Sequence, residues 1–293
     1  MSEKQTIGFV GTGVMGRSMA GHLLAAGYGV RVFNRTRAKA DELVGRGAVW
    51  CDSPGEAAAE ADVVVTIVGF PEDVEAVYLG DGGIVERAKE GSVLVDMTTS
   101  SPALAVRIAE AAGARGLGAL DAPVSGGDIG ARSAGLSIMV GGEAAMFDRV
   151  KPIFDVMGKK VVLQGGPGSG QHTKMCNQIA IASGMVAITE AMAYAKVSGL
   201  DPEVVLESIG GGAAASWGLA NLAPRMLKGD FAAGFYVKHF IKDMRIAVES
   251  AEAMGLELPG LKQAKELYEK LAAEGGEDDG TQALFGLYGV TDR

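Results

Sequence analysis

The chain has 293 residues, a length that favours two domains, with one large α/β domain as the alternative, and with 48% hydrophobic and 22% charged residues it has enough apolar material for a sizeable core. This composition excludes a largely disordered or fibrous protein. The formal net charge of -9 and the sequence pI near 5.0 argue against nucleic acid or an anionic membrane surface as the main partner, because either would require a broad basic face.

Two features of the sequence concern the compartment. The N-terminal stretch MSEKQTIGFVG enters an apolar strand pattern without a basic region or a small-residue cleavage site, so we expect a cytoplasmic protein. The two cysteines, Cys51 and Cys176, show no CxxC spacing, which fits a reducing compartment and predicts two buried thiols. The long apolar stretch 179–195 is interrupted by polar residues and glycine, so we interpret it as a buried helix rather than a membrane span.

From Thr6 to about Leu163, short β-branched runs alternate with polar or Ala-rich helical patterns, which is typical of βαβ units on a mostly parallel sheet. The runs are TIGFVG, GVRVFN, AVWC, DVVVTIV, SVLVDMT, GLGALDAPV, LSIMVGG and KVVLQ. Those at 62–68 and 92–97 are nearly continuous in Val, Ile and Leu and should be central strands. Residues 125–135, SGGDIGARSAG, show no periodicity and are predicted to be a loop, and LSIMVGG is a candidate for antiparallel pairing at the sheet edge.

The second half of the chain has a different pattern. After GGPGSG, residues 165–170, apolar spacing at three and four residues continues to about Glu274, with breaks at GLDPE, GGGAAA, LKGDFAAGF and GLELPG. We therefore predict an α/β domain with a mostly parallel sheet over residues 1–164, followed by an all-α domain over residues 165–293. A long interdomain helix over 171–198 has apolar residues on several faces, which predicts packing against a second subunit in a homodimer or homotetramer.

The first strand leads into a glycine-rich turn. GFVGTGVMGRSMAGHL places Gly11, Gly13 and Gly16 between a strand and a helix, the context in which G-x-G-x-x-G indicates a dinucleotide site. The first glycine permits the tight turn, the second lets backbone approach the pyrophosphate, and the third lets helix pack on strand. We expect this turn, with Val14 and Met15, to bind the cofactor diphosphate at the helix N-terminus.

The end of the second strand bears on which cofactor binds. An NAD-preferring site usually has an acid about twenty residues beyond the glycines, whereas this chain has Asn34, Arg35, Thr36 and Arg37. A guanidinium can pair bidentately with a 2′-phosphate. The sequence therefore predicts NADP(H) as the preferred cofactor, with NAD(H) as the alternative. Asn34, Arg35 and Thr36 are the candidate contacts.

Five stretches together resemble one family. GFVGTGVMG is followed by VDMTTSSP at 95–102, DAPVSGG at 121–127, GSGQHTKMCNQ at 168–178 and KHFIKDMRIA at 238–247. In this order and at these separations they resemble the β-hydroxyacid dehydrogenases, which include 3-hydroxyisobutyrate dehydrogenase, tartronate semialdehyde reductase and glyoxylate/succinic semialdehyde reductase. The resemblance covers nearly the whole chain, and it implies an active site in a cleft between a Rossmann domain and a helical domain.

The resemblance also implies roles for individual residues. Lys174 would be the catalytic acid/base, and Ser125, Gly126 and Gly127 would bind the substrate. Cofactor contacts are implied for four further residues: Val68, Gly69, Thr98 and Lys242. The family often shows two asparagines three and four residues after the lysine, where this chain has Asn177 and Gln178, so which of the two amides contacts substrate stays open.

The spacing of the residues is compatible with this chemistry. On a helix, Lys174, Asn177 and Gln178 at i, i+3 and i+4 share one face. A lysine ammonium can stabilise the alkoxide that develops during carbonyl reduction and then give up a proton. We find no HExxH or Cys/His cluster, so no metal site is predicted.

The leading hypothesis is an NAD(P)-dependent oxidoreductase that interconverts a small anionic 3-hydroxy acid and its semialdehyde. One alternative is a glyoxylate/succinic semialdehyde reductase, because KHFIKDMRIA resembles the final motif of that branch. Another is a nucleotide-binding module without catalysis, which would have no reason to keep Lys174 together with Ser125. A Lys174→Ala variant discriminates between the enzyme and the module.

Overall fold

A computed structural model describes residues 4–290 of the chain. The chain forms two compact units that divide between Lys174 and Met175, inside one long helix. The sequence-predicted boundary lay at 164/165, ten residues earlier (174 − 164). The first turn of the long helix groups with the N-terminal unit because it is hydrogen-bonded to residues of the sheet.

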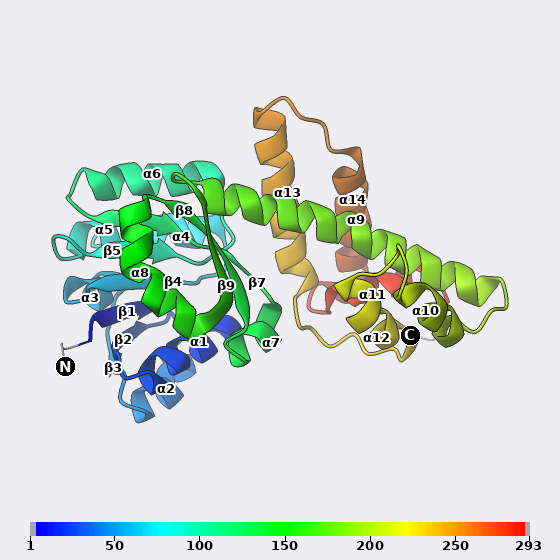
Figure 1. Cartoon of the computed structure of the whole chain (residues 1–293), viewed down its shortest axis with the longest axis horizontal. Coiled ribbons are helices and arrows are strands. Elements are labelled where there is room, and N and C mark those ends of the chain that lie inside the picture. The colour runs from blue at the N-terminus through cyan, green and yellow to red at the C-terminus, as the bar shows by residue number, and fades with distance from the viewer. Residues whose placement is uncertain (1–3, 291–293) are drawn as a thin grey trace. The chain divides into compact units, whose positions relative to one another are not determined.

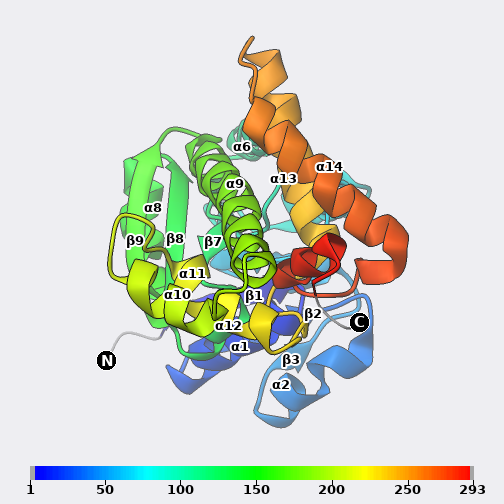
Figure 2. The same cartoon turned by 90° about the vertical axis from the view of Figure 1, so that its right-hand side faces the viewer.

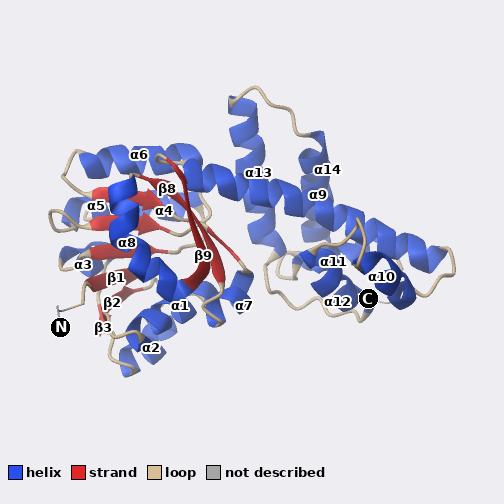
Figure 3. Ribbon diagram, viewed as in Figure 1, coloured by secondary structure: helices blue, strands red, loops and turns tan. Residues whose placement is uncertain are grey.

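The N-terminal unit is built on a mostly parallel sheet, and among residues 4–290 this sheet has nine strands (Figures 1 and 3). Its order is β3-β2-β1-β4-β5-β6-β8-β7, with β9 paired to β8, and the first six positions have the Rossmann order. The strands are β1 (Thr6–Val10), β2 (Gly29–Phe33), β3 (Val49–Trp50), β4 (Val63–Thr66), β5 (Val93–Asp96), β6 (Gly118–Asp121), β7 (Val124–Ser125), β8 (Leu136–Gly142) and β9 (Gly158–Gly165).

Both faces of the sheet are buried under helices. Alternate side chains of β4 go to opposite cores: Val63 and Val65 join one cluster, and Val64 joins the other. The first cluster contains residues of α1 (Val14–Ala25), α2 (Asp41–Gly45) and α8 (Ala144–Met157), and the second contains residues of α3 (Pro54–Ala59), α4 (Pro71–Leu79), α5 (Ile84–Arg87) and α6 (Pro102–Gly113). All residues of β4 and β5 are buried, which confirms the predicted central strands.

One sequence prediction in this unit is wrong. Residues 125–135 are not an irregular loop, since they include Ser125, the last residue of β7, and the short helix α7 (Gly127–Arg132). The helix is too short for a periodic signal, but an Asp128–Arg132 ion pair spans it, and Gly130 and Ala131 are buried. The expected antiparallel pairing of β8 is confirmed with β6 and β7, although β8 lies inside the sheet, between β6 and β9.

The C-terminal unit is helical, as predicted. The long helix α9 (Ser169–Val197) leads into it, and α10 (Pro202–Gly210), α11 (Trp217–Asn221), α12 (Ala223–Leu227), α13 (Val237–Ala253) and α14 (Pro259–Leu271) follow. Two further helical segments, Ala272–Gly276 and Thr281–Tyr288, end the described chain. All four predicted glycine- and proline-rich breaks fall at helix boundaries.

The core of this unit contains residues of α9, of the hairpin of α13 and α14, of α11 and α12, and of the segment Thr281–Tyr288. Helices α13 and α14 lie side by side in Figure 2. Phe240 of α13 packs edge-on against Tyr268 of α14, with ring centroids 5.0 Å apart, and both side chains are fully buried. Among the described helices, α9 is the one whose length and composition would allow it to cross a membrane, and half of its most apolar window is buried in the structure. Met185 and Met192 lie in the core, whereas Tyr194 and Val197 are exposed.

Candidate functional site

The carboxyl ends of the parallel strands meet at one edge of the sheet, where an open α/β fold binds its ligands. The glycine turn follows β1, Asn34 follows β2, Val68 follows β4, Thr98 follows β5 and Val124 follows β6. The topology therefore brings to one edge residues that are up to 113 positions apart in the sequence (124 − 11).

The three glycines of the turn differ in what a side chain at each position would meet. Gly11 has a φ of +100°, and a Cβ on it would overlap the carbonyl oxygen of Ile67, while a Cβ on Gly16 would overlap the carbonyl oxygen of Gly11. A Cβ on Gly13 would meet no protein atom within 4 Å. The space above Gly13 is thus left open by the protein, and Val14, at the start of α1, is 57% exposed. This cradle fits the diphosphate of a dinucleotide.

The loop after β2 is held to the glycine turn by Asn34. Its Oδ1 accepts a hydrogen bond from the Thr12 amide at 2.9 Å, and its Nδ2 donates to the carbonyl of Thr36 at 2.9 Å. The neighbouring Arg35 reaches Asp73 of α4 at 3.2 Å, with 87% of its side chain exposed. The structure therefore gives Asn34 an internal bonding role and leaves Arg35 accessible to a ligand.

A buried network fixes the loop after β5. The Thr98 hydroxyl accepts from the Val68 amide at 3.0 Å, and the Thr98 amide donates to Oδ1 of Asp96 at 3.0 Å. The Thr66 hydroxyl donates to the same carboxylate oxygen at 2.8 Å. Burial raises the pKa of Asp96 to about 6, although the hydrogen bonds from Thr98 and Thr66 lower it.

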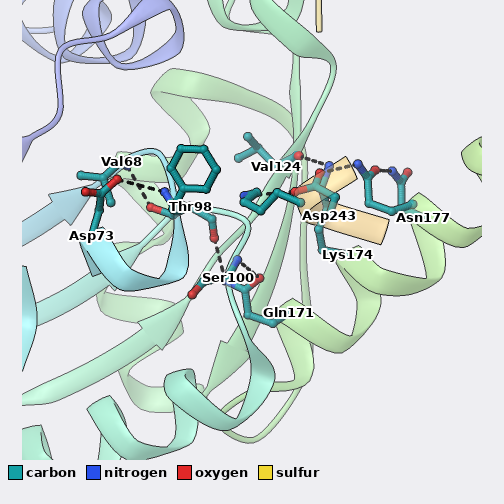
Figure 4. Close-up of polar contacts among 12 residues, drawn as sticks. Val68, Asp73, Thr98, Ser100, Val124, Gln171, Lys174, Asn177 and Asp243 are labelled. Carbon is teal, nitrogen blue, oxygen red and sulfur yellow. Dashed lines mark hydrogen bonds and ion pairs between the residues drawn. The ribbon is translucent and has the colours of Figure 1, made fainter. Parts of the chain in front are cut away.

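The first turn of α9 is tied to the same region. The Gln171 side chain donates to the carbonyl of Thr98 at 2.7 Å and accepts from the Ser100 amide at 2.9 Å (Figure 4). Asp121, at the end of β6, accepts hydrogen bonds from the amides of Gly168 and Gln171. Burial raises the pKa of Asp121, against these backbone hydrogen bonds, which lower it.

Lys174 follows one turn later on α9. It is buried, and its Nζ donates to the carbonyl of Val124 at 2.8 Å, so the ammonium lies beside the peptide that precedes Ser125 (Figure 4). The next two residues, Gly126 and Gly127, both have positive φ, +123° and +60°, a conformation in which successive amides can form an anion-binding nest. The N-terminal unit alone therefore brings together Lys174 and the Ser125–Gly127 segment.

The C-terminal unit holds the remaining predicted residues. Asn177 Nδ2 donates to Oε1 of Gln178 at 2.7 Å, and Gln178 Nε2 donates to Oδ2 of Asp243 at 2.6 Å. Lys242 Nζ lies 3.1 Å from Oδ1 of Asp243, and Gln178, Lys242 and Asp243 are all buried. The Lys242–Asp243 ion pair is therefore buried rather than exposed to solvent.

Sequence reasoning missed four polar residues: Asp96, Asp121, Gln171 and Asp243. All four lie inside motifs quoted above, but no spacing rule indicates that a strand residue such as Asp121 will bond to a helix start 47 positions later. The prediction of two buried thiols is wrong for Cys176, which is exposed on α9, while Cys51 is buried. Within residues 4–290, no three His, Cys, Asp or Glu side chains are grouped so that they could hold a metal ion.

The strand order, the glycine turn and the open cradle above Gly13 define a dinucleotide-binding protein of the Rossmann class.

Comparison with known proteins identifies the family. Residues 6–166 match the model of the NAD-binding domain of 6-phosphogluconate dehydrogenase, and residues 168–288 match that of the NAD-binding region of NADP-dependent 3-hydroxyisobutyrate dehydrogenase. An uncharacterised oxidoreductase of Bacillus subtilis is 61% identical over 97% of this chain and 99% of its own. The 2-hydroxy-3-oxopropionate reductase of Escherichia coli is 40% identical over 95% of each chain.

Among solved structures, 3-hydroxyisobutyrate dehydrogenase of Mycobacterium tuberculosis superposes with a TM-score of 0.90 and 32% identity, over 97% of this chain and 98% of that one. The chain belongs to the β-hydroxyacid dehydrogenase family. It is an NAD(P)-dependent oxidoreductase that acts on a CH–OH group.

Proposed function

We propose that this enzyme interconverts a small anionic 3-hydroxy acid and its semialdehyde, of the 3-hydroxyisobutyrate or tartronate semialdehyde type, with Lys174 as general acid/base. The observation that carries the proposal is the buried Lys174 ammonium, 2.8 Å from the carbonyl of Val124 and beside Ser125. The relatives named 3-hydroxyisobutyrate dehydrogenase and 2-hydroxy-3-oxopropionate reductase support this substrate class.

The residues have separate tasks in this proposal. Ser125 and the amides of Gly126 and Gly127 bind the substrate carboxylate. Lys174 donates a proton to the developing alkoxide during reduction and takes it back in the reverse direction. When bound, the nicotinamide supplies or accepts the hydride.

We assign the cofactor to the cradle of the N-terminal unit. Gly11, Gly13, Val14, Met15 and Gly16 hold its diphosphate, and Val68, Gly69 and Thr98 lie toward its nicotinamide end. Lys242 of the C-terminal unit completes the proposed cofactor contacts, and Asn177 and Gln178 the substrate contacts. NADP(H) is the preferred cofactor because Arg35, with Thr36 beside it, offers an accessible guanidinium to a 2′-phosphate.

The proposal extends to assembly and location. Exposed apolar side chains on the C-terminal unit, including Tyr194, Val197 and Val204, support a homodimer or homotetramer. Light scattering measures this directly, and a monomer would contradict it. A cytoplasmic location remains part of the proposal.

The experiment is a panel of short semialdehydes and hydroxy acids, assayed by NADPH oxidation or NADP⁺ reduction, for the wild type and for Lys174→Ala. General acid–base catalysis contributes about a hundredfold or more, so kcat should fall by at least that factor while cofactor binding is retained. An unchanged turnover in Lys174→Ala would remove Lys174 from the mechanism. Preferential turnover of glyoxylate or succinic semialdehyde would favour that branch of the family.

A further inference from the structure

Asp121 lies where α9 begins. Its two carboxylate oxygens accept from the backbone amides of Gly168 at 2.8 Å and Gln171 at 2.7 Å, and these contacts are buried. The first turn of a helix leaves amide groups without intrahelical partners, and a side-chain acceptor normally comes from the residue just before the helix. Here the acceptor comes from β6, 47 positions before Gly168.

Two glycines leave room for the Asp121 carboxylate at the start of α9. A Cβ on Gly170 would overlap the carbonyl oxygen of Asp121, and a Cβ on Gly141 of β8 would lie 2.5 Å from Oδ1 of Asp121. Neither position tolerates a larger residue without moving the helix start away from the sheet. The sequence therefore keeps backbone and carboxylate in direct contact at this point.

Gln171 makes the second connection. Both ends of its carboxamide bind backbone of the loop after β5, at Thr98 and Ser100, and the side chain is fully buried. The Thr98 hydroxyl in turn holds the Val68 amide. A single residue of α9 thus connects the helix to two loops at the carboxyl edge of the sheet.

Asp96 is the register partner of Asp121 on the adjacent strand β5. A cavity of about 10 Å³ is lined mainly by apolar residues, and the titratable residues in its lining are Asp96, Asp121 and Tyr78 of α4. The helix cap and the Thr98 loop are therefore anchored on neighbouring residues of one buried pair.

We propose that Asp121 and Gln171 are positioning residues of the active site, because they fix the first turn of α9, and with it Lys174, against the loop that carries Thr98. The proposal rests on the proposed function in assigning proton transfer to Lys174. The bonding itself is independent of that assignment. A misplacement of about 1 Å between reacting groups can cost about a hundredfold in rate, which sets the scale of the effect.

The test compares Asp121→Asn and Gln171→Met in the full chain. Asn offers one acceptor oxygen in place of two, and Met is close to Gln in size but makes neither hydrogen bond. In both variants kcat should fall about 10- to 100-fold, with the NADPH KM within about twofold of the wild type. The basic limb of the kcat–pH profile should shift in Asp121→Asn, because the surroundings of Lys174 change. Asp155→Asn, an exposed aspartate on α8, is the matched control.

A second readout needs no turnover. The asparagine in Asp121→Asn can accept from only one of the two amides, so hydrogen exchange at the Gly168 or the Gln171 amide should accelerate at least about tenfold in this variant, and both should stay unchanged in Asp155→Asn. Wild-type kcat with unchanged exchange in Asp121→Asn would overturn the proposal, and so would a parallel loss of cofactor binding and turnover in Gln171→Met. If Asp121→Asn does not fold, Gln171→Met decides. If the wild type turns over no substrate of the panel, faster exchange still supports the positioning role, and only the proposed function fails.

Discussion

Arg35 is the residue on which the cofactor preference depends. Its guanidinium lies 3.2 Å from Asp73, but an ion pair with 87% of one side chain exposed contributes about 1 kcal/mol at most. A 2′-phosphate, with its larger charge and bidentate geometry, should therefore displace Asp73 readily.

We expect Arg35→Ala to raise the NADPH KM about tenfold or more and to leave the NADH KM within about twofold, since a charge-assisted hydrogen bond contributes about 1.5–3 kcal/mol. Initial-rate kinetics with both cofactors measure the change. Arg37→Ala is the control, because the Arg37 guanidinium lies 5.2 Å from the Trp50 ring centroid and is engaged there. A wild type that prefers NADH tenfold would refute the assignment.

The hydrogen bond from Gln178 of α9 to Asp243 of α13 is a contact between helices that places a strict requirement on residue type. It is 2.6 Å long and joins two buried side chains, and Asn177 donates to the other end of the same amide. The amide of Gln178 must supply a donor to Asp243 and an acceptor to Asn177 at the same time. The carboxamide of Gln178 meets both requirements.

Gln178→Glu places two buried carboxylates against each other, so we expect a lower melting temperature and a loss of stability of about 2 kcal/mol or more. The double variant Gln178→Glu, Asp243→Asn restores a donor facing an acceptor and keeps the acceptor for Asn177. It should recover most of the stability and part of the kcat/KM. Thermal unfolding and kinetics of the four species form a double-mutant cycle, and a double variant no better than the single one would contradict this account.

At the scale of the whole molecule, the buried carboxylates make stability depend on pH. The pKa of Asp96 is raised to about 6 in the folded protein from an ordinary 3.8, mainly because burial disfavours the charged form. The folded state then binds the proton more tightly than the unfolded state. The free energy of unfolding should therefore be higher at low pH and fall as pH rises through the window from about 4 to 6.

We expect the free energy of unfolding of Asp96→Asn not to fall as pH rises through this window. The stability difference between wild type and variant should shift by about 2 kcal/mol in favour of the variant between pH 4.5 and pH 7. Urea unfolding of the N-terminal unit, followed by Trp50 fluorescence in a Trp217→Phe background, measures it. Asp62→Asn is the control, because the Lys89 hydrogen bond lowers the pKa of Asp62 instead of raising it. The stability difference between wild type and Asp62→Asn should therefore be nearly constant between pH 4.5 and pH 7. A constant difference for Asp96→Asn would contradict the prediction.

Local sequence patterns were enough to predict the architecture of the two units. The continuous Val-rich runs identified β4 and β5 as central strands, and the glycine spacing identified the turn after β1, because burial on two faces and a positive φ leave marks within a few residues. Helix α7 was missed because six residues hold less than two turns. The exposure of Cys176 was missed because it depends on which face of α9 meets the core.

By itself, the sequence determined the alternation of strands and helices on a mostly parallel sheet, the helical second unit, the dinucleotide turn and the motifs that show the family. These depend on periodicity, glycine conformation and residue type, all of which are local. Only the tertiary structure showed that Asp121 caps α9, that Gln171 donates a hydrogen bond to the carbonyl of Thr98, and that Gln178 donates one to Asp243. Each of those contacts joins groups that are far apart in the sequence and meet only when the strands pair or the helices pack. The spacing of residues within one segment does not predict such contacts.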